Sequence, residues 1–189
     1  MTQGHPETIR TMIKPYLTKM RGGPLKRGKP HVADALWSWL GAFLGMALIG
    51  WMSSHYLAVS TLLLVGSFGA TSVLLYGAPH SPLAQPRNVL GGNLLSALVG
   101  VACYHWLGDG WLAAAMAVSV ALLVMQLTHT LHPPGGATAL IAVIGGEPLH
   151  ALGYWYALLP VGLGCLAMLV LAVLINNLAR HRRYPLHWH

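Results

Sequence analysis

The chain has 189 residues, of which 55% are hydrophobic and only 8% are charged. An ordinary soluble domain of this length carries roughly 25% charged residues, so the composition predicts an integral membrane protein. The net charge of +7 does not indicate a nucleic-acid-binding domain, because the basic residues gather at the two ends of the chain rather than over a soluble core. We expect a lipid bilayer as the surroundings and no nucleic-acid partner.

The N-terminal tail, residues 1–30, is basic and holds no apolar run that would make a secretory signal peptide. Apolar residues between Ile9 and Met20 recur at helical spacing opposite basic ones, which predicts an interfacial amphipathic helix. Residues 180–189 form a second short tail, rich in Arg and His. Because Lys and Arg favour the cytoplasmic side, we expect both termini in the cytoplasm, at a bacterial inner membrane.

The transmembrane domain is expected between the tails, over residues 31–179. Apolar runs predict full spans at 35–52, 56–76, 89–107, 111–131 and 154–178. If both tails and Arg87 share one side, the number of crossings is even, whereas five is odd. The further apolar piece at 137–144 is about 12 Å long as a helix, too short to cross roughly 30 Å of hydrocarbon. We therefore expect residues 132–146 to be irregular backbone plus a half-helix, buried inside the protein. Whether residues 132–149 cross or re-enter stays open at this point.

The stretch "HTLHPPGGATAL", residues 129–140, interrupts the fourth run. Proline cannot donate a backbone hydrogen bond, so the fourth helix should end near Leu131. Two glycines then allow close approach of another group, and a new helix should begin near Ala137. The first turn of that helix would present unpaired N–H groups, which attract anions.

A short internal repeat accompanies this break. "GATSVLLYG" at 69–77 resembles "GATALIAVIG" at 136–145. Paired interruptions of this kind point to a transport site between the halves of a membrane protein. The repeat predicts that Gly69, Ala70 and Thr71 open a second half-helix, so that two helix N-termini face one site. The hydroxyls of Thr71 and Thr138 would add donors there.

Polar residues before the break are the other candidates. Gln126, His129 and Thr130 share one helical face by spacing, and His132 follows one turn beyond His129. In lipid such side chains face the protein interior or a cavity, although hydrogen bonding between helices also explains Gln126 and Thr130. The predicted substrate-binding or pathway residues are Gly69, Ala70, Thr71, Gln126, His129, His132, Pro133, Pro134, Gly135, Gly136, Ala137 and Thr138. No catalytic residue, metal ligand or cofactor is assigned.

Several small residues have the spacing that lets helices approach closely. These packing positions are Gly41 and Gly45 in the first span and Gly92, Ser96 and Gly100 in the third. Pro160 is expected to kink the last span.

Two long stretches, "GSFGATSVLLYGAPHSPLAQPRNVLGGNLLSALVG" and "LTHTLHPPGGATALIAVIGG", resemble the HPP family of integral membrane proteins, named for the motif found here at His132, Pro133 and Pro134. The resemblance covers about residues 30–178. It implies a small all-α protein with four or more transmembrane helices. Plastid and cyanobacterial members of the family are regarded as nitrite transporters, many bacterial members have no established substrate, and some members carry extra soluble domains.

Three functions remain in competition. The first is a transporter or channel for a small monovalent anion, led by nitrite, which fits the lack of acidic residues within the spans. The second is a redox or metal protein in which histidines bind haem or a metal ion. The third is an assembly subunit without a substrate. None is an enzyme, and the small-residue faces predict a homodimer or homotrimer.

Overall fold

The computed structural model describes residues 31–56 and 61–188, and every regular element within them is helical. The predicted amphipathic helix of the N-terminal tail lies outside the described residues. The long helices in chain order are α2 (Val32–Tyr56), α3 (Thr61–Gly77), α4 (Pro86–Leu107), α5 (Trp111–Leu127), α6 (Pro134–Ile144) and α8 (Leu163–Leu178). Shorter elements are the 3-10 turn η1 (Pro82–Ala84), α7 (Glu147–His150) and the π-helical turn η2 (Ala157–Gly162).

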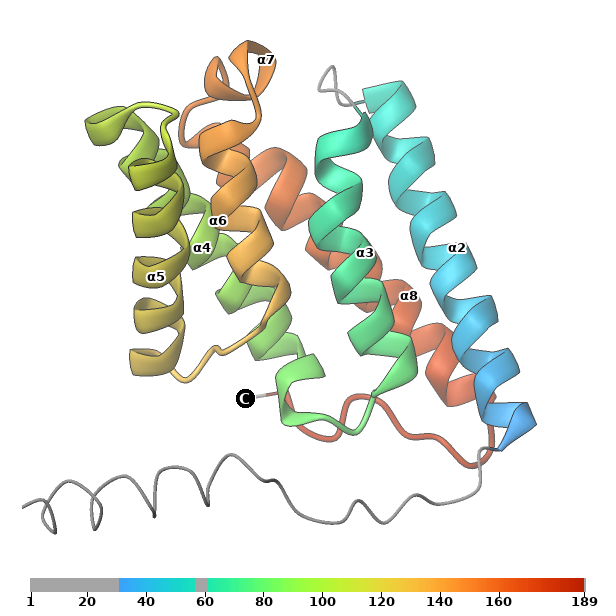
Figure 1. Ribbon diagram of the computed structural model, residues 1–189. Coiled ribbons are helices and arrows are strands. Elements are labelled where there is room, and N and C mark those ends of the chain that lie inside the picture. Colours follow the sequence, from blue (N-terminus) through green and yellow to red (C-terminus); the bar gives the residue numbers. More distant parts are fainter. Residues whose placement is uncertain (1–30, 57–60, 189) are drawn as a thin grey trace, which may run out of the picture. The chain divides into compact units, whose positions relative to one another are not determined.

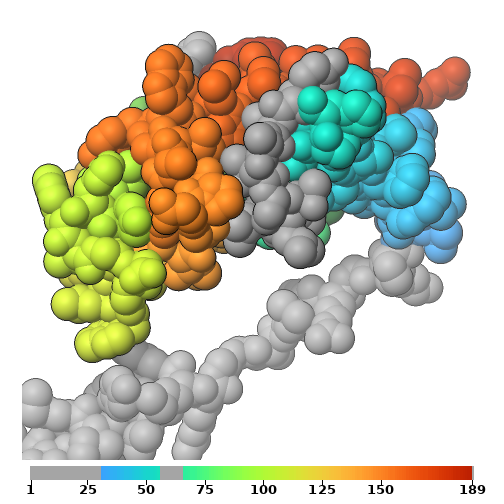
Figure 2. Space-filling model, turned by 90° about the horizontal axis from the view of Figure 1, so that it is seen from above, coloured from blue at the N-terminus to red at the C-terminus, as the bar shows by residue number. Residues whose placement is uncertain are grey.

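The long helices alternate in direction, so that α6 supplies the crossing that makes their number even (Figure 1). Consequently the start of α2, the loop at 78–85 and the C-terminal segment at 179–188 share one end of the bundle, here called the basic end. The opposite end holds the turn after α4 and helix α7. Seen from that far end, α6 and α7 lie between the α4–α5 turn on one side and α2 with α3 on the other (Figure 2).

The helices have the lengths and surfaces of a membrane protein. Three segments are long and apolar enough to cross a bilayer, namely Val32–His55, Pro86–Leu107 and Ala157–Leu178. Large apolar side chains point outward along them, for example Phe43 on α2 and Leu174 on α8, both 59% exposed. An exterior this apolar is stable against lipid rather than water. With 11 residues, α6 is only about 16 Å long and crosses only as part of the bundle.

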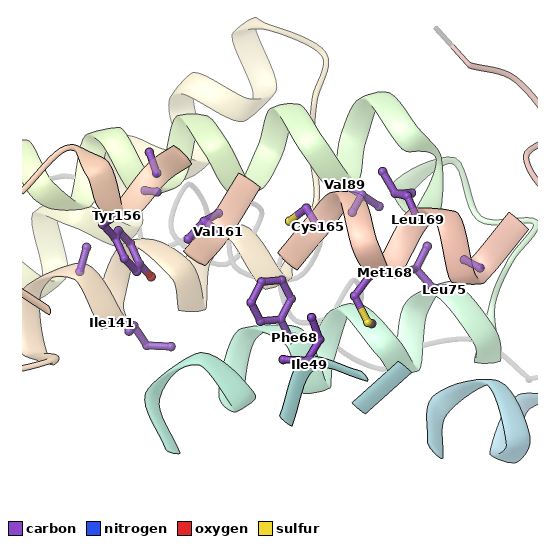
Figure 3. Close-up of a cluster of buried hydrophobic side chains, with 14 of the residues drawn as sticks. Ile49, Phe68, Leu75, Val89, Ile141, Tyr156, Val161, Cys165, Met168 and Leu169 are labelled. Carbon is purple, nitrogen blue, oxygen red and sulfur yellow. The ribbon is translucent and has the colours of Figure 1, made fainter. Parts of the chain in front are cut away.

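The main core lies among α2, α3, α4 and α8. Ile49, Phe68, Leu75, Val89 and Met168 are among its buried members (Figure 3). The Tyr76 ring lies directly against Gly41 and Gly45, which confirms the close-packing role predicted for that glycine pair. A second cluster fills the contact of α5 with α4 and α6, and it uses small residues, chiefly Ala113, Ala117, Ala121 and Ala139.

Three predicted helix limits are wrong, the first two of them in α3 and α5. Helix α3 runs without interruption through Gly69, Ala70 and Thr71, so no half-helix begins there and only one of the two repeat segments follows a break. Helix α5 ends at Leu127 rather than near Leu131. It ends early because His129 takes a left-handed conformation (φ 55°) and the Thr130 N–H donates to Met125 O, a common way to close a helix.

Prolines lie at the start of one span and near the start of another. Pro160, which was predicted to kink the last span, lies inside the π-helical turn η2 at the head of that span. By contrast, α6 already begins at Pro134 instead of near Ala137. Proline suits the first position of a helix because its missing N–H would have no partner there and its fixed φ is helical.

Candidate functional site

His132 is the centre of the candidate site. Its side chain is fully buried, and both ring nitrogens are bound. Nδ1 lies 2.8 Å from the carbonyl oxygen of Leu83 in η1, and Nε2 lies 3.0 Å from Oγ1 of Thr71 in α3. The histidine therefore joins three segments that are far apart in the sequence. The adjacency predicted for the 69–71 and 132–136 segments is present, through this side-chain contact.

The partners of His132 define its protonation pattern. A backbone carbonyl only accepts hydrogen bonds, so Nδ1 carries the proton and donates to Leu83. In the neutral ring, Nε2 then bears a lone pair and accepts a hydrogen bond from the Thr71 hydroxyl. The arrangement is that of a neutral imidazole, oriented by a carbonyl on one side and a buried hydroxyl on the other.

The start of α6 does not present the free N–H groups that the sequence predicted. Pro133 and Pro134 have no N–H, and the N–H groups of Gly135 and Gly136 donate to His132 O and Pro133 O at 2.8 and 3.0 Å. The motif thus satisfies its own first turn. An anion at this place would be met by side chains rather than by the helix end.

Close approach at the break comes from Gly92 and Gly135. A Cβ on Gly92 would lie 2.7 Å from both His132 Cβ and Thr130 O, and one on Gly135 would lie 2.7 Å from Ser96 Oγ. Only glycine fits where backbones come this near. Gly92 and Ser96 were predicted as packing positions in the third span, and both lie at this contact between α4 and the break.

A network of three buried polar residues lies between the site and the far end. Thr138 Oγ1 donates to Asn93 Oδ1 at 2.6 Å, and the Tyr156 hydroxyl donates to Thr138 O at 3.1 Å. All three side chains are at most 2% exposed. These bonds tie α6 to α4 and to the chain before η2, and they use the Thr138 hydroxyl that the sequence offered as a free donor.

The remaining predicted residues are divided between the two sides of the break. Thr130, Pro134 and Gly135 are buried, and Ala137 and Gly136 are partly exposed. Gln126, His129 and Pro133 are exposed; Gln126 and His129 belong to the end of α5 and the turn that closes it, whereas Pro133 directly follows His132. The shared helical face predicted for Gln126, His129 and Thr130 is absent because the helix stops before His129.

Sequence reasoning missed the polar cluster that closes the basic end. Arg182, only 9% exposed, donates to Asp34 Oδ1 at 3.0 Å, to Ser38 Oγ at 2.9 Å and to Tyr76 O at 3.1 Å. His181 also contacts Asp34, at 2.7 Å. One signal was available in the sequence, since Asp34 is the acid nearest to the first span. The three arginines within residues 180–183, however, have the sequence pattern of an ordinary solvated tail.

The C-terminal segment at 179–188 connects this cluster to the candidate site. The Tyr184 hydroxyl donates to Ala84 O at 2.7 Å, and the Leu186 N–H donates to Gln85 Oε1 at 2.9 Å. The two acceptors are the first and second residues after Leu83, the partner of His132. Burial raises the pKa of the Tyr184 phenol, so this donor keeps its proton at neutral pH.

Two hollows flank the site. One, of about 330 Å³ at the basic end, is lined by polar groups that include Ser38, His80 and Arg182. The other, of about 490 Å³, is an apolar groove along α3 and α6 that includes Ala70, Val73 and Pro133. Within the described residues, no three His, Cys, Asp or Glu side chains gather as a metal site would require.

The family model for the transmembrane region of HPP proteins matches residues 27–185. Two transmembrane proteins of Dictyostelium discoideum are similar to the chain. One is 40% identical over 96% of this chain and 60% of its own length, and the other is 42% identical over 95% and 65%. The chain therefore spans less than two thirds of these relatives. No solved structure matches it.

The matched region includes all six long helices, His132 with its two hydrogen-bond partners, and the Pro-Pro-Gly-Gly turn that starts α6. The protein is membrane-embedded, and it belongs to the HPP family of transmembrane proteins.

Proposed function

We propose that the protein moves a small monovalent anion across the membrane, with nitrite as the leading candidate, through the site formed by His132 and Thr71. The observation that carries the proposal is a fully buried imidazole paired with a buried hydroxyl inside a membrane-embedded bundle. Ionisable side chains buried inside a membrane-embedded bundle are costly and commonly mark a substrate or proton pathway. The resemblance to nitrite transporters in the family supports the same class of substrate.

The charges of the bundle support an anion rather than a cation. The body between the tails contains three acids, Asp34, Asp109 and Glu147. Asp34 is engaged by Arg182 and His181, and the other two lie at the far end. Among the residues that the structure describes, no carboxylate therefore contacts His132, whereas the basic end carries the cations that would attract an anion toward it.

The geometry suggests how a proton and an anion would travel together. Nδ1 of His132 stays bound to Leu83, so an incoming proton binds Nε2 and converts it from an acceptor to a donor. The Nε2–H and the freed Thr71 hydroxyl can then both donate to the anion. A protonated imidazole with a monovalent anion is neutral as a pair, which lowers the cost of placing either charge in the interior.

The described arrangement corresponds to the closed state of this cycle. His132 is fully buried and its Nε2 is occupied by Thr71. Substrate binding thus requires a second state in which the contact between Thr71 and His132 opens. This requirement favours a gated, proton-coupled carrier over a permanently open channel.

The test is nitrite uptake into proteoliposomes, with Thr71→Val compared with Thr128→Val. Valine keeps the shape of threonine and removes the hydroxyl, and Thr128 is an exposed residue of the loop after α5. A hydrogen bond to a charged group is worth about 1.5–3 kcal/mol, so Thr71→Val should weaken substrate affinity about ten- to a hundredfold. Thr128→Val should match the wild type, and wild-type flux should rise as the outside pH falls.

Two controls make the result decisive. Nitrous acid crosses bilayers unaided, so protein-free liposomes are subtracted and the less permeant nitrate is measured in parallel. If neither anion moves faster than in empty liposomes, anion transport is rejected. Absorbance spectra and metal analysis of the purified protein would then test the haem or metal alternative.

We also propose that both termini face the cytoplasm of a bacterial inner membrane and that the protein forms a dimer or trimer. The basic end supports the orientation, because basic loops stay on the cytoplasmic side. The exposed small residues Gly66, Ala70 and Gly77 on α3 support the oligomer, since such residues let helices of two copies approach closely. A mass measured in nanodiscs that corresponds to one chain would reject the oligomer.

A further inference from the structure

A lateral groove between α4 and α8 has no part in the proposed transport. Its volume is about 410 Å³, and its walls are apolar side chains that include Leu90, Leu166, Val170 and Leu174. Leu166, Val170 and Leu174 are each more than half exposed, so the groove faces outward from the bundle. In a bilayer, a groove with such walls is filled by a hydrocarbon chain.

The lining changes character toward the basic end. Arg87, in the first turn of α4, and Trp188, near the end of the chain, belong to the same groove. Tryptophan prefers the boundary between the hydrocarbon and the headgroups, and arginine binds phosphate through several N–H donors. The groove thus combines apolar walls, which suit an acyl chain, with an aromatic ring and a guanidinium, which suit the headgroup region of a phospholipid.

The charge of Arg87 is not balanced by an acid within the described residues. Its guanidinium donates to the backbone carbonyl of Thr128 at 3.0 Å, which uses one nitrogen and leaves the positive charge uncompensated. Asp34, the acid at this end, is paired with Arg182 and His181. An exposed, unpaired cation beside an apolar groove is complementary to a negatively charged headgroup.

We propose that this groove is a binding site for an anionic phospholipid, with one acyl chain between α4 and α8 and the headgroup phosphate on Arg87. The site is separate from His132 and does not depend on what the protein transports. Phosphatidylglycerol is the probe of choice because it is anionic and can be compared with phosphatidylcholine carrying the same acyl chains.

The experiment is a lipid titration of the delipidated 189-residue chain in detergent, followed by native mass spectrometry. The wild type should bind phosphatidylglycerol roughly fivefold or more tightly than phosphatidylcholine, the effect expected of one basic side chain at the membrane surface. Arg87→Met should remove this preference and leave phosphatidylcholine binding unchanged, and Arg87→Lys should keep it. Arg183→Met, an equal loss of charge at an exposed position outside the groove, should have no effect.

The acyl-chain part is tested by Val170→Trp, which fills the groove from a lipid-facing position, against Leu123→Trp on the exposed face of α5. Val170→Trp should weaken the binding of both lipids at least several-fold, and Leu123→Trp should leave the binding of both unchanged. Equal effects of Arg87→Met and Arg183→Met would show only diffuse attraction and overturn the proposal. So would unchanged binding of both lipids to Val170→Trp, because it would mean that no acyl chain occupies the groove.

Discussion

His132 holds three parts of the bundle in register through a single side chain. Its two hydrogen bonds reach η1 and α3, and its own backbone carbonyl accepts the first bond of the turn into α6. Buried polar groups stabilise a fold only when all their partners are present, because an unpaired one loses its hydration without compensation. The same residue thus serves structure in the closed state and, in the proposed cycle, chemistry in the open one.

Replacement of His132 should separate these two contributions. His132→Ala leaves a cavity and two unpaired partners, at Leu83 and Thr71, and should lower the free energy of unfolding by about 2–4 kcal/mol. His132→Asn can still donate to Leu83 and should cost about half as much. Thermal unfolding read by a thiol-reactive dye is suitable because Cys103 and Cys165 are buried and free. Wild-type unfolding of His132→Ala would contradict a structural role.

At the scale of single elements, the sequence predicted the interruption but not its internal geometry. Proline and glycine chemistry predicted that one helix ends and another begins in this stretch, but it placed the end of α5 four residues too late and the start of α6 three residues too late. It could not reveal that the turn satisfies its own N–H groups, since that depends on bonds from Gly135 and Gly136 to His132 O and Pro133 O. Nor could it distinguish the two glycines, which occupy different surroundings despite being neighbours.

That difference gives a matched pair of variants. A Cβ on Gly135 would lie 2.7 Å from Ser96 Oγ and 3.0 Å from Gly92 O, whereas one on Gly136 would find only Val118, at 3.8 Å. Gly135→Ala should therefore destabilise the protein by about 1–3 kcal/mol through overpacking. Gly136→Ala should be neutral or stabilise it by about 0.5–1 kcal/mol, because alanine favours a helix. Thermal unfolding of the two purified variants compares them, and equal melting temperatures would refute the assigned packing.

On the scale of the whole molecule, the internal repeat is consistent with an even number of crossings that includes α6. The repeat segments lie in α3 and α6, which run in opposite directions (Figure 1). Two helices, α4 and α5, lie between them, so equivalent positions are three helices apart in chain order, and an odd offset inverts the second copy. Hydropathy alone found the long helices and missed the role of α6, because an 11-residue helix does not look like a span. The network around Arg182 escaped prediction because it joins residues nearly 150 positions apart, such as Asp34 and Arg182.

The six-pass arrangement predicts which residues share a side of the membrane. Single cysteines at His80, Arg183 and Asp109, with Cys103 and Cys165 replaced by alanine, probe both ends, since all three positions are exposed. Asp109 is preferred to Gly108, whose φ of 76° would strain a side chain. His80 and Arg183 should react with a membrane-impermeant maleimide only from the cytoplasm, and Asp109 only from outside.

The labelling pattern separates the number of crossings from the orientation. If Asp109 reacts from the same face as His80, helix α4 does not cross and the bundle described here is wrong for the membrane. If the two react from opposite faces but with the sides exchanged, the six crossings stand and only the cytoplasmic placement of the basic end is rejected. We expect the basic end in the cytoplasm because the opposite orientation would translocate many basic residues. These are the seven Lys and Arg residues of the N-terminal tail, together with Arg180, Arg182 and Arg183 after α8.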